Sequence, residues 1–116
     1  MVMQEFHALV DEAKKEIQEI TPADLKKMQQ RGDDFILVDV REKDEAAKGM
    51  IPSAVNVTRG TLELNIDQVT TDKNKKIVLY CGGGSRSALA ALSLKKMGFK
   101  NLISLAGGYK GWIQSK

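Results

Sequence analysis

The chain has 116 residues, enough to bury one hydrophobic core but too few for two domains. Its composition, 42% hydrophobic and 28% charged with a net charge of +3, is typical of a globular protein and excludes the disordered and collagen-like classes. No apolar run approaches the ~20 residues of a membrane span, and residues 1–20 lack the pattern of a secretory signal, so we expect no membrane segment and a cytoplasmic protein.

The N-terminal segment has the pattern of an amphipathic helix. Its apolar residues recur at helical spacing, with charged residues between them: Phe6, Leu9, Val10, Ala13, Ile17 and Ile20. A short edge strand is expected at the end of this segment, near residues 17–20. A second helix is predicted to begin at Thr21, with Pro22 at its first position and Asp24 as the capping acid, and to end near Gly32.

The rest of the chain alternates between strand and helix patterns. Short, continuous apolar runs predict strands buried on both faces at residues 35–38, 77–80 and 102–105. Helix-like stretches lie between them, at residues 42–48, 61–68 and 85–97. This alternation favours an α/β fold, a parallel sheet with helices on both faces. Ligands of such sheets bind at the carboxyl ends of strands, which points to the turn after Tyr80.

The turn after Tyr80 is rich in glycine and leads directly into a predicted helix. It consists of Cys81, Gly82, Gly83, Gly84, Ser85, Arg86 and Ser87. The glycines allow backbone N–H groups to converge on one point, and the helix adds the positive end of its dipole. Arg86 adds a forked donor that is permanently charged. The turn therefore has the composition of an anion-binding loop.

Cys81 is the only cysteine, so it cannot form an intramolecular disulfide and serves either packing or chemistry. A packing cysteine needs neither the glycines nor Arg86. In this loop the pKa of the thiol should lie below the free value of ~8.5, as it does for cysteines at helix N-termini. We therefore predict that Cys81 is a nucleophilic thiolate. Because a substrate must reach it, we also expect its sulfur to be accessible to solvent.

Other kinds of site fit the loop less well. A Walker-type phosphate loop requires Lys and then Ser or Thr after its last glycine, and this pair is missing. A metal site requires several Cys or His ligands, and the chain holds one of each, far apart in sequence, so we expect no metal. His7 lies on the N-terminal helix, where we do not expect it to serve Cys81 as a base. Ionisation by the loop must then suffice.

Charge is distributed unevenly along the chain. Residues 1–72 contain 9 basic and 15 acidic side chains, a balance of −6, and residues 73–116 contain 9 basic and no acidic ones, a balance of +9; together they give the net +3. The positive C-terminal half would attract anions. Because only 5% of the residues are aromatic and no nucleic-acid-reading motif is present, we expect no nucleic-acid partner.

In four blocks the chain resembles the rhodanese (thiosulfate sulfurtransferase) family, specifically its single-domain members. The blocks are residues 37–42 (LVDVRE), 49–56 (GMIPSAVN), 80–87 (YCGGGSRS) and 105–108 (LAGG), followed by Trp112. The resemblance covers the chain from about Ile17 to Trp112. It implies a five-stranded parallel sheet with helices on both faces, in a rhodanese-like domain over residues 17–116. Residues 1–16 would form an added N-terminal helix.

The resemblance also implies the chemistry and the roles of the site residues. Cys81 would take a sulfane sulfur from thiosulfate or a persulfide, hold it as a persulfide without a cofactor, and pass it to a thiol or to cyanide. The amides from Gly82 to Ser87 would cradle this sulfur, and Arg86 would fix the loop and face small anionic donors. Asp39 and Arg41 resemble the supporting pair of the family, and we expect them to orient the site rather than react.

The sequence departs from the family pattern in places. The family usually has His where Met50 stands and Gly where Ser53 stands, which concerns local loop geometry more than activity. Two-domain thiosulfate enzymes often place basic side chains just after the cysteine, whereas Gly82 and Gly83 carry none. Thiosulfate is therefore expected to be a poor substrate, with a persulfide or a partner protein as the donor.

Two other functions compete with sulfur transfer. Phosphatases and arsenate reductases use related Cys-to-Arg loops, but four residues separate Cys81 from Arg86 here and phosphatases use five, which makes a wider cradle. A non-catalytic interaction module is the other alternative, because some rhodanese-like domains have lost the cysteine. Here the cysteine is present, and the N-terminal helix is the segment in which a partner-binding role would be tested.

Overall fold

The computed structural model describes residues 2–115 and contains a five-stranded parallel sheet. The spatial order of the strands is β1-β5-β4-β2-β3. Their bounds are β1 (Gln18–Ile20), β2 (Ile36–Asp39), β3 (Val55–Asn56), β4 (Ile77–Tyr80) and β5 (Leu102–Leu105). β4 is therefore the central strand, and the predicted parallel α/β sheet is confirmed.

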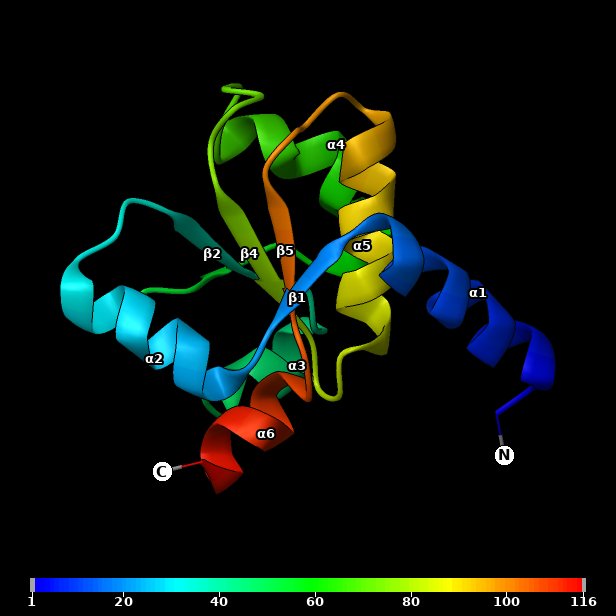
Figure 1. Cartoon of the computed structure of the whole chain (residues 1–116), viewed down its shortest axis with the longest axis horizontal. Helices are drawn as coiled ribbons and strands as arrows, with labels where there is room; N and C mark the ends of the chain where they lie inside the picture. The colour runs from blue at the N-terminus through cyan, green and yellow to red at the C-terminus, as the bar shows by residue number, and fades with distance from the viewer. Residues whose placement is uncertain (1, 116) are drawn as a thin grey trace.

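Helices cover both faces of the sheet (Figure 1). One helix was predicted at residues 61–68. The structure instead has a single α-helical turn there, with one 3-10 turn before it and another after it, over residues 59–68. The helices are α1 (Gln4–Glu16), α2 (Pro22–Arg31), α3 (Lys43–Ala47), α4 (Leu62–Asn65), α5 (Ser85–Lys96) and α6 (Gly108–Gln114). α2 and α6 pack on one face, and α4 and α5 pack on the other.

Alternate residues of the strands point to opposite faces and form two separate cores. One core combines side chains of three strands with those of α2 and α6: Leu37, Val78, Tyr80, Ile103, Leu105, Leu25, Met28 and Trp112. The other combines the remaining strand residues with those of α4 and α5: Val38, Ile77, Leu79, Leu102, Leu62, Ala90, Ala91 and Leu94. Burial on both faces explains why these strands are mostly apolar.

α2 begins and ends where its capping residues predict. The Thr21 hydroxyl accepts a hydrogen bond from the Asp24 N–H at 3.1 Å, and the Asp24 carboxylate accepts one from the Thr21 N–H at 3.0 Å. The helix ends at Gly32, whose φ of +70° is in the left-handed region. This capping box fixes the connection between the edge strand β1 and α2.

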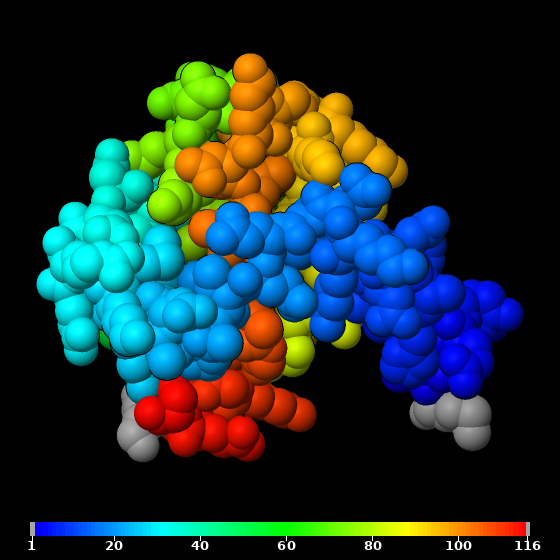
Figure 2. Space-filling model, viewed as in Figure 1, coloured from blue at the N-terminus to red at the C-terminus, as the bar shows by residue number. Residues whose placement is uncertain are grey.

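α1 lies at the edge of the molecule and packs on α5, not on the sheet (Figures 1 and 2). Val10 and Ala13 of α1 contact Ala88 of α5 in a small third core. Lys95 of α5 donates a hydrogen bond to the carbonyl of Glu16 at 2.9 Å. In residues 2–115, the helices are too short or too polar to cross a membrane.

β3 and α6 had no counterpart in the strand and helix patterns. β3 is two residues long, and Val55 in it is exposed, so no apolar run marks it. α6 begins at two consecutive glycines with positive φ, Gly107 at +77° and Gly108 at +57°, a pattern that suggests a turn. Both elements depend on contacts with other elements: β3 pairs with β2, and α6 packs with α2 on the sheet.

Candidate active site

Cys81 directly follows β4, at the carboxyl end of the central strand. Residues 81–84 turn the chain into α5, whose first residue is Ser85. Asp39 ends the neighbouring strand β2 and pairs in register with Tyr80. The fold therefore brings the two predicted groups of site residues to the same edge of the sheet, where ligands of such folds bind.

The Cys81 sulfur accepts hydrogen bonds from two amides of the loop. The N–H of Gly84 lies 3.1 Å from Sγ and the N–H of Ser87 lies 3.4 Å from it. Gly84 has a φ of +104°, which turns its N–H toward the sulfur and favours glycine at this position. These donors and the N-terminal end of α5 stabilise negative charge on the sulfur.

A pair of buried hydroxyl groups extends this network below the loop. The Ser87 hydroxyl lies 3.5 Å from the Cys81 sulfur and 2.8 Å from the hydroxyl of Ser104 on β5. Both serines are fully buried. Ser104 was not predicted as a site residue; its signal in the sequence is that it is the one polar residue in the apolar run at 102–105.

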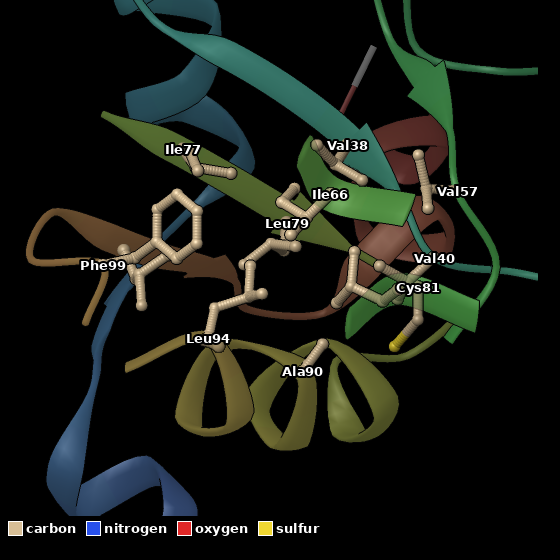
Figure 3. Close-up of a cluster of buried hydrophobic side chains, with 13 residues drawn as sticks. Val38, Val40, Val57, Ile66, Ile77, Leu79, Cys81, Ala90, Leu94 and Phe99 are labelled. Carbon is tan, nitrogen blue, oxygen red and sulfur yellow. The ribbon is translucent and has the colours of Figure 1, made fainter. Parts of the chain in front are cut away.

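The structure contradicts the expectation that the Cys81 sulfur is accessible. Cys81 is 1% exposed and belongs to the core between the sheet and α5. Figure 3 shows it at one end of that core, near Val40 and Ala90. The physical reason is that the sulfur lies between the loop amides that bind it and the side chains of the core to which Cys81 belongs. A reagent can therefore reach Sγ only if some of these surrounding groups move.

Arg86 is paired with Glu45, a residue that the sequence analysis did not identify. Its guanidinium donates to the two carboxylate oxygens of Glu45 at 2.9 and 3.1 Å. These bonds, and a further one from the Glu42 N–H at 3.0 Å, lower the pKa of Glu45 from 4.5 to about 2. The ion pair raises the pKa of Arg86 in turn. Arg86 thus ties the start of α5 to α3.

Asp39 and Arg41 form a buried ion pair beside the loop. Arg41 donates to the Asp39 carboxylate from Nε at 3.0 and 3.1 Å and from Nη2 at 2.7 Å. The same Nη2 donates to the Gly49 carbonyl at 2.7 Å. These bonds to Asp39 raise the pKa of Arg41. The guanidinium also lies 4.2 Å from the ring centre of Tyr109, so the pair supports α6.

The N-terminal end of α6 packs directly on the cysteine loop. The N–H of Tyr109 donates to the Cys81 carbonyl at 2.8 Å, and the N–H of Lys110 donates to the Gly82 carbonyl at 3.1 Å. Gly108 allows this approach, because a Cβ built on it would lie 2.4 Å from the Cys81 carbonyl oxygen. The Gly107-Gly108 turn is therefore part of the support of the site.

The departures from the family pattern lie outside the cysteine loop. Ser53 has a φ of +74°, the only positive φ of a non-glycine residue in the described chain. This conformation explains why glycine is usual there. Met50 is half-buried, between Gly49 and the buried Ile51. His7 is exposed on α1, the helix that packs on the outer side of α5.

Comparison with known proteins agrees with this geometry. The family described as "Rhodanese-like domain" matches residues 21–115. The chain belongs to the rhodanese-like family. A Bacillus subtilis (strain 168) protein provisionally named sulfurtransferase YtwF is 38% identical over 97 residues, 84% of this chain and 91% of the relative. The thiosulfate sulfurtransferase GlpE of Coxiella burnetii is 32% identical over 79 residues, 68% of this chain and 72% of the relative.

A solved structure from Rhodopseudomonas palustris is similar over almost the whole chain. The two superpose with a TM-score of 0.87 at 35% identity, over 99% of this chain and 93% of the other. That protein is described as one of unknown function, with tyrosine phosphatase suggested for it. The expected rhodanese-like fold is thus confirmed, and sulfurtransferase is the activity named for both sequence relatives of this rhodanese-like protein.

Proposed function

We propose that this rhodanese-like protein carries a sulfane sulfur as a persulfide on Cys81, between a small donor and a thiol or cyanide acceptor. The observation that carries the proposal is the position of the Cys81 sulfur. It lies at the N-terminal end of a 12-residue helix and accepts N–H bonds from Gly84 and Ser87 at 3.1 and 3.4 Å. Such an environment favours the thiolate, which is the nucleophilic form of cysteine.

The transfer divides into two displacements. In the first, the Cys81 thiolate attacks the outer sulfur of thiosulfate, the bond between the two sulfur atoms breaks, and its electron pair leaves with sulfite. One thiolate and one thiosulfate dianion thus give one persulfide anion and one sulfite dianion. In the second, an acceptor thiolate or cyanide attacks the outer sulfur of the persulfide, and Cys81 returns to its thiolate. No oxidant is consumed, because each step exchanges one bond to sulfur for another.

Each site residue has a part in this proposal. The amides of residues 82–87 stabilise the anionic sulfur before and after transfer. Arg86 fixes the loop through Glu45, and Asp39 and Arg41 hold α6 against the loop without reacting. Residues 17–116 form the catalytic domain and α1 is an addition to it. We expect the protein to act in the cytoplasm, where a reducing environment keeps a lone cysteine as a thiol.

Burial of Cys81 adds one requirement to the proposal. The donor must reach a residue that is 1% exposed, so we expect the loop to move outward during loading. Gly83 is the exposed part of the loop, and a Cβ built on it would meet nothing within 4 Å. The outer side of the loop therefore has open space into which it can move.

A phosphatase is the second candidate, because the similar Rhodopseudomonas palustris protein is described with that suggestion. The loop argues against it. Four residues separate Cys81 from Arg86, and Arg86 is already bound by a carboxylate that would repel a phosphoryl group. Hydrolysis of an aryl phosphate by the native protein, lost in Cys81→Ser, would favour the phosphatase instead.

Intact-protein mass spectrometry tests the sulfur-carrier proposal. After treatment with thiosulfate or polysulfide, the protein should gain the mass of one sulfur atom and lose it again on addition of cyanide. Cys81→Ser should gain nothing. His7→Ala serves as the matched control and should load like the native protein, because His7 is exposed on α1. Equal loading of native protein and Cys81→Ser would place the sulfur elsewhere and overturn the proposal.

A further inference from the structure

The charge of Arg86 lies beside the reacting cysteine, but it is already neutralised. Both Nη atoms donate to Glu45, in the parallel two-bond geometry that is strongest for arginine and carboxylate. A Cβ built on Gly82 would lie 3.3 Å from Nη2 of Arg86, so the guanidinium is adjacent to the first residue after Cys81. The anionic form of Cys81 is close enough to raise the pKa of Arg86.

The other charged groups around the loop do not restore a positive site. Glu42 is the N-cap residue of α3, and its N–H binds the same Glu45 oxygen that accepts from Arg86, which brings a second carboxylate near the guanidinium. Lys110 is a further cation at the loop, since its N–H donates to the Gly82 carbonyl and its side chain is exposed. Glu42, Glu45, Arg86 and Lys110 sum to zero charge, the ion pair of Asp39 and Arg41 adds none, and a thiolate at Cys81 makes the site negative.

We propose that Glu45 determines donor specificity: by binding Arg86 it disfavours dianionic donors such as thiosulfate relative to donors with one negative charge or none. This inference rests on the proposed sulfur transfer and concerns the donor of the same site. A positive cleft raises the local concentration of an anionic substrate, whereas a neutral or negative cleft does not. A thiosulfate dianion approaching the Cys81 thiolate meets no unpaired guanidinium, and a singly charged persulfide is repelled less.

Two donors of similar shape isolate the effect of charge. Thiosulfate is a dianion, and methanethiosulfonate is the corresponding monoanion with a methyl group in place of one oxygen. Each gives the Cys81 thiolate one sulfur atom, and the leaving group keeps the electron pair as sulfite or as methanesulfinate. The quantity measured is the ratio of kcat/KM for thiosulfate to kcat/KM for methanethiosulfonate, with cyanide as acceptor.

Glu45→Gln is the informative variant. A glutamine oxygen can still accept the Glu42 N–H that begins α3, so the fold is retained while the negative charge is lost. We expect the thiosulfate-to-methanethiosulfonate ratio to rise about tenfold, since a charge close to the reacting atoms is removed. Glu42→Gln should raise it in the same direction by about threefold, because Glu42 acts on Arg86 without a hydrogen bond to it.

Asp33→Asn is the matched control. This substitution also removes a carboxylate that pairs with an arginine, in this case Arg31. Asp33 lies just before β2, at the end of the sheet opposite to the cysteine loop. Its ratio should equal that of the native protein. If Glu45→Gln changes both donors by the same factor, Glu45 only supports the loop and the inference is wrong while the sulfur transfer stands. If Glu45→Gln does not fold, an unchanged ratio in Glu42→Gln overturns the inference.

The outcome for the native protein separates the two proposals. Formation of a Cys81 persulfide with methanethiosulfonate, together with a low thiosulfate ratio that Glu45→Gln raises, supports both. Absence of a persulfide with either donor in every variant overturns the sulfur-transfer proposal, and the donor inference falls with it.

Discussion

At the scale of single residues, the Cys81 sulfur is both bound by fixed hydrogen-bond donors and buried. The amides of Gly84 and Ser87 lie within 3.4 Å of Sγ, and the residue is 1% exposed. A solvated thiolate would be easier to reach but would lack these fixed donors. Because the donors need no reorganisation when charge develops, they would stabilise the anion at every stage of the proposed transfer. The proposed transfer then requires the loop to move to admit a donor.

Gly108 is the glycine at which an added side chain would most closely approach the cysteine loop. In Gly108→Ala the new Cβ would lie 2.4 Å from the Cys81 carbonyl oxygen, and the φ of +57° is unfavourable for alanine. We expect a loss of about 3 kcal/mol in the free energy of unfolding, measured with urea, because backbone on both sides must shift. Persulfide loading should fall as well.

Gly60→Ala is the control for this glycine. A Cβ at Gly60 meets nothing within 4 Å, and its φ is not positive, so stability should change by less than about 0.5 kcal/mol. Equal stability of Gly108→Ala and Gly60→Ala would contradict the close packing of α6 on the loop.

At the scale of elements, three helices converge on the loop after β4. α5 supplies the amide of Ser87, α6 donates two N–H groups to the carbonyls of residues 81 and 82, and α3 binds Arg86 through Glu45. The three helices thus contact the sulfur site through an amide, the loop backbone through two carbonyls, and Arg86 through its guanidinium. Among these contacts, the ion pair between Glu45 of α3 and Arg86 of α5 is the one that depends on pH, because Glu45 can be protonated.

Acid should weaken the link between α3 and α5. The pKa of Glu45 in the folded protein is about 2, below its ordinary 4.5, so the unfolded chain binds more protons between these values. The contribution of Glu45 to stability is therefore complete above pH 4.5 and is lost as the pH falls through about 2. Urea unfolding at several pH values should show the gap between native protein and Glu45→Gln closing over this interval. A gap that does not change with pH would contradict the assignment.

At the scale of the whole molecule, the sheet and α1 are coupled through α5. α1 contacts α5 by Val10 and Ala13, while β1 closes the sheet by pairing with β5. These adjacent segments therefore contribute differently to the fold: α1 packs on α5, and β1 pairs with the otherwise free edge of β5. The positive half of the chain, with its 9 basic residues after residue 72, includes both α5 and α6 around the site.

Stepwise truncation should separate these tasks. Deletion of residues 1–16 exposes the surface around Ala88 and should lower the free energy of unfolding by about 2 kcal/mol, the value of a small buried apolar contact. Persulfide loading should persist. Deletion of residues 1–20 also removes β1 and leaves the edge of β5 unpaired, which should reduce solubility. Loss of loading in a folded chain that lacks residues 1–16 would instead make α1 part of the site.

The sequence by itself determined the elements that rest on local signals. The apolar runs at 77–80 and 102–105 match β4 and β5, and the capping residues around Thr21 set the start of α2. The glycine-rich turn marked the cysteine loop, because glycine and a helix start are sufficient for an anion-binding backbone. The resemblance to rhodaneses supplied the five-stranded sheet, which the apolar runs alone did not complete.

Only the tertiary structure decided the contacts between residues distant in sequence. Glu45 and Arg86 are 41 positions apart, and no local pattern predicts that one neutralises the other. Because β5 lies beside β4, Ser104 reaches the Ser87 hydroxyl and Gly108 packs against the backbone of residues 81 and 82. Burial of Cys81 has the same origin, because the exposure of an atom depends on every segment that folds around it, whereas the glycine loop and the helix start depend on residues adjacent along the chain.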